Sequence, residues 1–168
     1  MNIIASPKTG KSWLALDLAF TVATGRPWLG MFSTVKGDVL ILDNELHGET
    51  LADRIPKVAS ARGIALAEIA ETVVVDNLLG RLKDLLALGS YFRSIEPNRF
   101  KIIVLDAFYR FLPAETDEND NATMAMLYNH LDRHARDLGC CFVLIHHATS
   151  AGESGAVESK KTAKSADK

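Results

Sequence analysis

The sequence predicts an α/β fold in three layers, in which helices cover both faces of a mainly parallel sheet of about five strands. Two observations lead to this prediction. Five short apolar runs rich in β-branched residues recur along the chain, and segments with apolar residues at helical spacing separate them. Because strands that alternate with helices are joined by right-handed crossovers, the strands are expected to run parallel in one sheet.

The five apolar runs are nearly continuous in hydrophobicity, as expected of strands that are covered on both faces. They are residues 2–5 (NIIA), 38–44 (DVLILDN), 72–77 (TVVVDN), 100–107 (FKIIVLDA) and 140–148 (CCFVLIHHA). Most of them end in acids, amides or histidines. Parallel sheets place ligands at the carboxyl edge of their strands, so the chemistry is expected there.

Four segments between these runs are predicted to be helical: residues 12–24, 49–62, 81–95 and 122–138. The first is almost wholly apolar and stops at Gly25. Pro56 is expected to kink or split the second. The apolar residues expected to face the core from the other three are Leu51, Ile55, Val58, Ala59, Leu82, Leu85, Leu86, Leu88, Phe92, Met124, Leu127, Leu131 and Leu138.

Composition is that of an ordinary soluble globular protein, with 48% hydrophobic and 24% charged residues and a net charge of -2 over 168 residues. No apolar stretch reaches the roughly 18 residues of a membrane span, and no signal peptide precedes the first strand. Cys140 and Cys141 are adjacent and are not expected to form a disulfide, which favours the cytoplasm. Residues 1–152 are predicted to be the folded core, and the polar, Lys-rich residues 153–168 a disordered tail.

The segment ASPKTGKS (residues 5–12) follows the first strand and opens the first helix. In the pattern G-x-x-x-x-G-K-[ST], this order directs backbone N–H groups and a helix N-terminus at a polyphosphate. Lys11 is then expected to reach the β- and γ-phosphates, and the Ser12 hydroxyl to bind Mg²⁺. A turn that merely opens a helix is the less favoured alternative. Ala5 replaces the first glycine, which costs about 1–2 kcal/mol at a positive φ but nothing if the residue is extended.

Two other strand ends carry acids. Asp106 closes the fourth run and is expected to hold the Mg²⁺ shell through water, unless it merely caps a turn. Glu45 follows Asp43 and Asn44 at the end of the second run, where it could orient or deprotonate a water molecule. A solvated Glu45 is a serious rival interpretation, and Asp43 is then the alternative base.

His146 and His147 end the fifth run and point to opposite faces, which disfavours a shared metal. One is predicted to face the γ-phosphate while the other packs or caps. Two structural histidines are an equal alternative. Residues 117–121 (DENDN) resemble the start of a calcium loop, but Ala122 and Tyr128 stand where Gly and Glu are required. They are predicted to be a surface loop in which Asp120 or Asn121 caps the next helix.

Taken together, these segments resemble the RecA-like P-loop ATPases, in particular the plasmid and phage AAA-family branch with the RepA-type hexameric replicative helicases. The resemblance rests on PKTGKSWLALDLAFTVATGRPWLG, VLILDNELHGETLADRI, IIVLDAFYRFLPAETDENDN and FVLIHHATSAG. It implies a RecA-like core in which the Asp106 strand lies between those of Glu45 and His146. The residues implied at the nucleotide are Pro7, Lys8, Thr9, Gly10, Lys11, Ser12 and Trp13, with Ser12 and Asp106 at the metal and Glu45, Lys11 and one of His146 and His147 in catalysis.

The resemblance further implies an ATP- and Mg²⁺-dependent ATPase of DNA replication, which forms a ring such as a hexamer and acts on single-stranded DNA. Family members continue past the histidine strand to an arginine that reaches a neighbouring subunit's nucleotide, whereas residues 153–168 contain no arginine. Weak turnover by this chain alone is therefore expected. A shortened homologue that binds nucleotide without productive hydrolysis is an alternative. A small-molecule kinase ranks lower, because no Arg-rich lid segment follows the late strands.

Overall fold

Five parallel strands form one sheet in the part of the chain that the structure, a computed structural model, describes: residues 1–81, 84–114, 116–117 and 120–148. The predicted tail, 153–168, lies outside these residues. In chain order the strands are β1 (Asn2–Ala5), β2 (Val39–Asp43), β3 (Val73–Asn77), β4 (Ile102–Asp106) and β5 (Cys141–His147). Their spatial order is β1-β5-β4-β2-β3, and every pair is parallel. The predicted strands and their parallel arrangement are confirmed.

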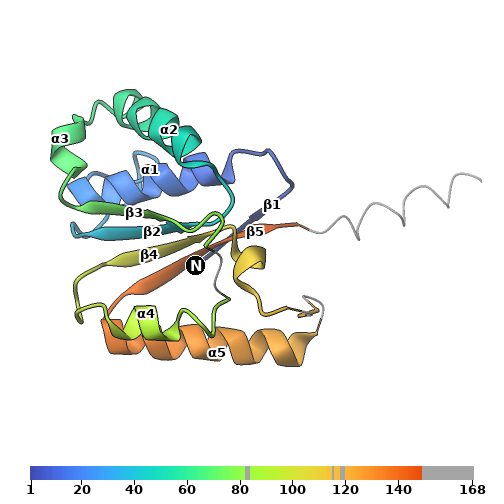
Figure 1. Cartoon of the computed structure of the whole chain (residues 1–168). Coiled ribbons are helices and arrows are strands. Elements are labelled where there is room, and N and C mark those ends of the chain that lie inside the picture. The colour runs from blue at the N-terminus through green and yellow to red at the C-terminus, as the bar shows by residue number, and fades with distance from the viewer. Residues whose placement is uncertain (82–83, 115, 118–119, 149–168) are drawn as a thin grey trace, which may run out of the picture.

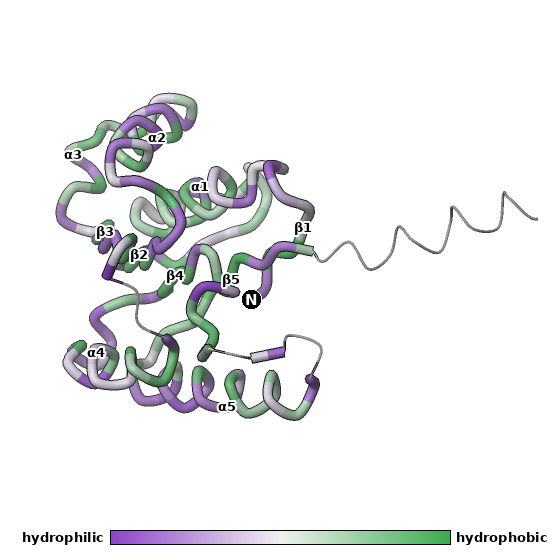
Figure 2. Tube along the Cα trace, turned by 45° about the vertical axis from the view of Figure 1, so that its right-hand side comes forward, coloured by the Kyte–Doolittle hydropathy of each residue, from purple (hydrophilic) through white to green (hydrophobic). Residues whose placement is uncertain are grey.

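Helices cover both faces of this sheet, as the three-layer prediction requires (Figure 1). On one face lie α1 (Lys11–Thr24), α2 (Gly48–Ala61) and α3 (Leu66–Ile69), and on the other α4 (Gly89–Arg93) and α5 (Asn121–Leu138). Two apolar clusters fill the two interlayer spaces, one around Phe20 and Ile41 and the other around Phe92 and Leu105. Figure 2 shows the apolar residues gathered along the strands between these helix layers.

The first helix follows the sequence prediction closely. Gly10 precedes α1 with φ 93°, and Gly25 ends it with φ 75°, donating its N–H to the Val22 carbonyl oxygen at 3.3 Å. Both glycines occupy the left-handed region, where other residues are strained. Because α1 lies between the sheet and α2, residues around much of its circumference are buried. This explains why its sequence is apolar almost throughout.

Pro56 does not split α2, which runs without a break from Gly48 to Ala61. Proline removes the hydrogen bond to the carbonyl of residue 52. Ala52 and Pro56 are both exposed, so water can reach that carbonyl. Leu51, Val58 and Ala59 remain buried on the opposite side, as predicted, and this packing keeps the helix whole.

The predicted helix over residues 81–95 is wrong in its first half: only Gly89–Arg93 form α4. The Leu85 N–H donates to the Phe111 carbonyl oxygen at 2.6 Å, and the Ala87 N–H donates to Asp84 Oδ1 at 2.8 Å, so these donors are unavailable for helical bonds. The predicted core side chains Leu85, Leu88 and Phe92 are nevertheless buried, whereas Leu86 is 52% exposed and Leu82 lies outside the described residues.

Two short elements have no clear signal in the sequence, α3 and the 3₁₀ turn η1 (Phe108–Phe111) that follows β4. Asp120 caps α5 by accepting the Ala122 N–H at 3.0 Å, one of the two predicted caps. Both cysteines are free thiols. Within the described residues, no helix is long and apolar enough to cross a membrane.

Candidate functional site

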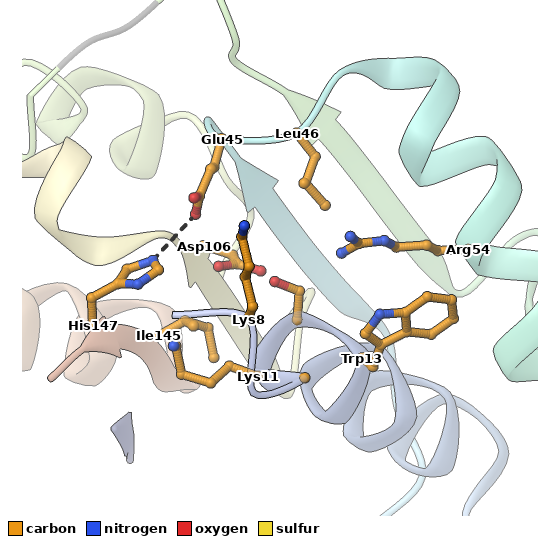
Figure 3. A pocket seen from close by; sticks show the side chains of 11 residues that line it. Lys8, Lys11, Trp13, Glu45, Leu46, Arg54, Asp106, Ile145 and His147 are labelled. Carbon is orange, nitrogen blue, oxygen red and sulfur yellow. Dashed lines mark hydrogen bonds and ion pairs between the residues drawn. The ribbon is translucent and has the colours of Figure 1, made fainter. Parts of the chain in front are cut away.

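A cavity of about 350 Å³ lies at the carboxyl ends of the strands, between the β1–α1 loop and α2 (Figure 3). The register of the sheet brings these ends together, since Asp43 lies opposite Asp106. Eight of the predicted site residues line the cavity, namely Lys8, Gly10, Lys11, Ser12, Trp13, Glu45, Asp106 and His147. Leu46, Arg54 and Ile145 complete the lining, while Pro7, Thr9 and His146 are not part of it.

The β1–α1 loop has the shape of an anion cradle. Lys8 adopts a left-handed φ of 63°, and Gly10 one of 93°, which turns the chain into α1. Thr9 Oγ1 donates to the Ser6 carbonyl oxygen at 2.8 Å and closes the loop on itself. The Lys11 ammonium is buried and donates to the carbonyl oxygens of Ala5 and Ser6, each at 2.8 Å. Since an ammonium has three donors, Lys11 keeps one available for the cavity.

Ala5 causes no strain in this loop. It is the last residue of β1, paired in register with His147, and it is not among the residues with positive φ. Its backbone is extended, where a methyl group is freely tolerated. The left-handed backbone lies instead at Lys8 and Gly10, so the loop does not require a glycine at position 5.

Asp106 and Ser12 face each other at the base of the cavity. Burial raises the pKa of Asp106 to about 6, a hydrogen bond from the Ser12 side chain opposes this rise, and the nearby Asp43 carboxylate adds to it. The Oδ1 atom of Asp106 is buried without a hydrogen-bond partner. A carboxylate oxygen left unsatisfied beside a serine hydroxyl fits a divalent cation, which oxygen ligands would bind.

The described residues contain no cluster of three or more His, Cys, Asp or Glu side chains that could hold a metal ion. A cation at Ser12 and Asp106 would therefore need further oxygens from water or from a ligand. Mg²⁺ commonly keeps several waters and binds through one or two protein groups and phosphate oxygens. The donor set is thus suited to a cation that arrives with a phosphate ligand.

Asp43, the alternative base, has a structural place instead. The residue is 1% exposed, and its Oδ1 atom accepts the N–H groups of Glu45 at 2.9 Å and Leu46 at 2.8 Å. Burial raises the pKa of Asp43, and these two backbone hydrogen bonds oppose the rise. Asp43 does not line the cavity, so it shapes the loop that carries Glu45 rather than facing a ligand.

Glu45 and His147 approach each other across the cavity. Glu45 Oε2 lies 3.5 Å from His147 Nε2, the contact drawn as a dashed line in Figure 3. Both side chains are half-buried and line the cavity, Glu45 from the end of β2 and His147 from the end of β5. The site therefore places a carboxylate and an imidazole next to each other, opposite the β1–α1 loop.

His146 points to the other face of the sheet, as strand geometry predicts for neighbours. Its ring packs against Phe108 with 4.8 Å between centroids, and its Nε2 atom is buried without a hydrogen-bond partner. Burial lowers the pKa of His146, so the neutral ring is favoured. Of the two histidines, His147 is the one that the structure brings to the cavity.

Arg54 is a cavity residue that the sequence interpretation missed. It projects from α2, and its guanidinium lies 5.1 Å from the ring centroid of Trp13, which is 39% exposed (Figure 3). The helical periodicity of α2 marks Arg54 only as a polar residue beside the apolar face. Only the packing of α2 across α1 brings its side chain to the β1–α1 loop, so periodicity alone gives no signal for this role.

Two comparisons with known proteins agree with this geometry. Residues 1–153 match the family described as AAA domain. Among solved structures, the chain is similar to a helicase ATPase domain, with a TM-score of 0.61 and 16% sequence identity. That alignment covers 89% of this chain and 57% of the solved chain, so this chain spans little more than half the length of that structure. The predicted RecA-like α/β fold is confirmed.

The raised pKa of Asp106 makes a prediction about stability. Ionisation of a carboxyl whose folded pKa is raised costs stability; the cost is absent below its ordinary value of 3.8 and complete above about 6. Asp106→Asn removes this cost and still accepts a hydrogen bond from Ser12. We expect the ligand-free variant to gain about 1–3 kcal/mol in free energy of unfolding near pH 7.5, and progressively less toward pH 4. Urea unfolding across this range measures the gain.

Asp132→Asn is the matched control, because Asp132 is exposed on α5. It should leave the free energy of unfolding unchanged at every pH. A loss of stability in Asp106→Asn near pH 7.5 would contradict the burial of an ionised carboxylate at this position.

Proposed function

The chain belongs to the AAA domain family, and from that premise we propose that it binds ATP with Mg²⁺ in the cavity and hydrolyses the terminal phosphate. One observation carries the proposal. The buried Asp106 carboxylate has one oxygen hydrogen-bonded to Ser12 and the other unsatisfied, at the base of a cavity that Lys11 also lines. A phosphate ligand that carries a divalent cation completes both groups.

The β1–α1 loop and α2 supply the positive charge for the phosphates. Lys8, Lys11 and Arg54 line the cavity from these two elements. The N-terminus of α1 adds unpaired backbone N–H groups and the positive end of the helix dipole. Together they favour several negatively charged oxygens in one place, as in a nucleoside triphosphate.

Ser12 and Asp106 would hold Mg²⁺, Asp106 through water. When bound, the ion neutralises charge on the phosphate oxygens. We assign to Glu45 the orientation of the attacking water. The water oxygen forms the new bond to the γ-phosphorus, the bond from that phosphorus to the bridging oxygen breaks, and Glu45 accepts the proton that the water loses. Lys11 stabilises the negative charge that moves onto the leaving oxygens.

His147 is proposed to respond to the γ-phosphate through Glu45. The 3.5 Å contact between the two side chains means that a shift of either one changes the surroundings of the other. Tyr109 lies edge-on to the His147 ring with 5.3 Å between centroids, which connects this pair to η1. His147 is thereby the candidate among the two histidines for sensing the terminal phosphate.

The wider biological role is proposed from the family resemblance. We propose a RecA-like domain of a DNA replication helicase, or of a related plasmid or phage ATPase, that assembles into a ring. The likeness of the fold to a helicase ATPase domain supports this role. A second protomer could supply the arginine that the described cavity does not obtain from its own late strands.

The lysine assignment is tested by binding. Lys11→Ala should weaken ATP·Mg²⁺ binding by roughly 10- to 100-fold, because it removes a charge-assisted hydrogen bond worth about 1.5–3 kcal/mol. Trp13 provides the signal, since phosphate should draw Arg54 away from its ring. The sequence has two tryptophans, so a Trp28→Phe background leaves Trp13 as the single emitter.

Lys57→Ala is the control for this titration, because Lys57 lies on α2 with its side chain 59% exposed and paired with Asp53. Its affinity should equal that of the parent. Equal affinities for Lys11→Ala and the parent would disprove the phosphate role of Lys11.

The glutamate assignment is tested by separating binding from turnover. Glu45→Gln keeps the size of the side chain but accepts a proton poorly, so ATP affinity should persist while phosphate release falls by about 100-fold or more. Isothermal titration and single-turnover phosphate release measure the two quantities. Glu49→Gln, an exposed change in the first turn of α2, should leave both unchanged.

If Glu45→Gln and the unmodified chain release phosphate equally, Glu45 is not the base. ATP binding by the unmodified chain without any phosphate release would instead support the alternative function, a nucleotide-binding homologue that does not hydrolyse productively.

The ring assignment is tested by mass in solution. The 18.3 kDa chain should form a species several times heavier when ATP, Mg²⁺ and single-stranded DNA are all present, because ring ATPases bind nucleotide between subunits. Light scattering measures the mass. Lys11→Ala should remain smaller under the same conditions, and a monomeric mass for the unmodified chain would count against the ring.

A further inference from the structure

We infer that Arg110 is a positioning residue that fixes the peptide before Glu45 and thereby aims the Glu45 carboxylate into the cavity. The inference rests on the proposed function, since it concerns how the proposed base is held. Arg110 belongs to η1, the turn that directly follows β4 and the Asp106 end of that strand. Its position links the end of β4 to the end of β2.

The main contact is a hydrogen bond to the backbone. Arg110 Nη1 donates to the Asn44 carbonyl oxygen at 2.7 Å, and Arg110 is half-buried. This carbonyl belongs to the peptide unit that joins Asn44 to Glu45. A short hydrogen bond from a charged donor is stronger than one between neutral groups. Arg110 therefore restrains the rotation of the peptide that sets the position of the Glu45 Cα atom.

The other side of the same peptide is held as firmly. The Glu45 N–H donates to Asp43 Oδ1 at 2.9 Å. Asn44 is fully buried, its N–H donates to the Asp106 carbonyl oxygen at 2.8 Å, and its Oδ1 atom accepts the Ala107 N–H at 3.2 Å. Both polar groups of the peptide are thus bonded to charged side chains, an anion at the N–H and a cation at the carbonyl.

Arg110 also reaches the other end of the Glu45 side chain through two rings. Its Nε atom lies 3.2 Å from the Tyr109 hydroxyl oxygen, and its guanidinium lies 5.9 Å from the Tyr109 ring centroid. Tyr109 meets the His147 ring edge-on, and His147 Nε2 lies 3.5 Å from Glu45 Oε2. These contacts close a loop that starts and ends at Glu45 and joins the ends of β2 and β5 to η1.

Arg110 does not belong to the lining of the cavity, in contrast to Arg54. A residue outside the cavity that holds the backbone of the base should affect turnover and leave nucleotide affinity nearly unchanged. A residue that contacts phosphate should affect affinity as well. The two roles can therefore be separated by measuring both quantities on the same variants.

The test compares Arg110→Met, Arg110→Lys and Arg99→Met in the full chain. Arg99→Met is the matched control, because Arg99 likewise lies beside an aromatic neighbour, Phe100, and pairs with Asp38 away from the cavity. Three quantities are measured: ATP·Mg²⁺ affinity by isothermal titration, phosphate release in a single turnover, and hydrogen exchange of the Glu45 amide by NMR without nucleotide.

For Arg110→Met we expect phosphate release to fall roughly 10- to 100-fold, as for a small misplacement of a catalytic group, with ATP affinity within about twofold of the parent. The Glu45 amide should exchange about tenfold faster because its peptide is released. Arg110→Lys keeps one donor for the Asn44 carbonyl and should recover part of the turnover and amide protection. Arg99→Met should match the parent in all three measurements.

Two results would overturn the inference. One is an equal loss of affinity and turnover in Arg110→Met, which would make Arg110 a binding residue. The other is an unchanged exchange rate of the Glu45 amide in both Arg110 variants. If the parent binds ATP but releases no phosphate, the proposed hydrolysis fails, while faster exchange at Glu45 alone still supports the positioning role.

Discussion

The burial of two carboxylates side by side is the constraint on which the site depends. Parallel pairing of β2 with β4 sets Asp43 opposite Asp106, and both are almost completely buried. Two like charges in a low-dielectric interior are unfavourable, and burial raises the pKa of each. Asp43 offsets this cost by accepting two backbone N–H groups, whereas Asp106 keeps Oδ1 unsatisfied. Of two similar strand ends, one organises a loop and the other is left open to a ligand.

The sheet could be predicted from sequence because its strands are covered on both faces, and this leaves unbroken apolar runs such as VLILD in β2. The helices were harder wherever a distant contact decides the backbone. Leu85 and Leu88 carry a helical apolar pattern, yet the Leu85 N–H bonds to Phe111 and the helix begins only at Gly89. Pro56 shows the opposite outcome, since packing of α2 outweighs a local helix breaker at an exposed position.

For the site, sequence order located the strand ends but not the orientation of their side chains. Lys11, Glu45 and Asp106 were predictable because each sits next to an apolar run at the same edge of the sheet. The choice between the two histidines needed the twist and face of β5, and it falls on His147. Arg54 could not be foreseen, because its place in the cavity depends on how α2 packs over α1. The tolerance for Ala5 likewise follows from its extended backbone in β1.

The charges around the cavity also limit the kind of ligand it can accept. Lys8, Lys11 and Arg54 line it from the loop and α2, while Glu45 and Asp106 line it from the strand ends. A bare phosphate would satisfy the cations but would meet two acids, and a lone cation would meet the reverse. A phosphate chain that carries its own divalent cation satisfies both sets at once. Binding such a ligand also gives the raised pKa of Asp106 a reason to fall, because the cation favours the ionised carboxylate that burial disfavours.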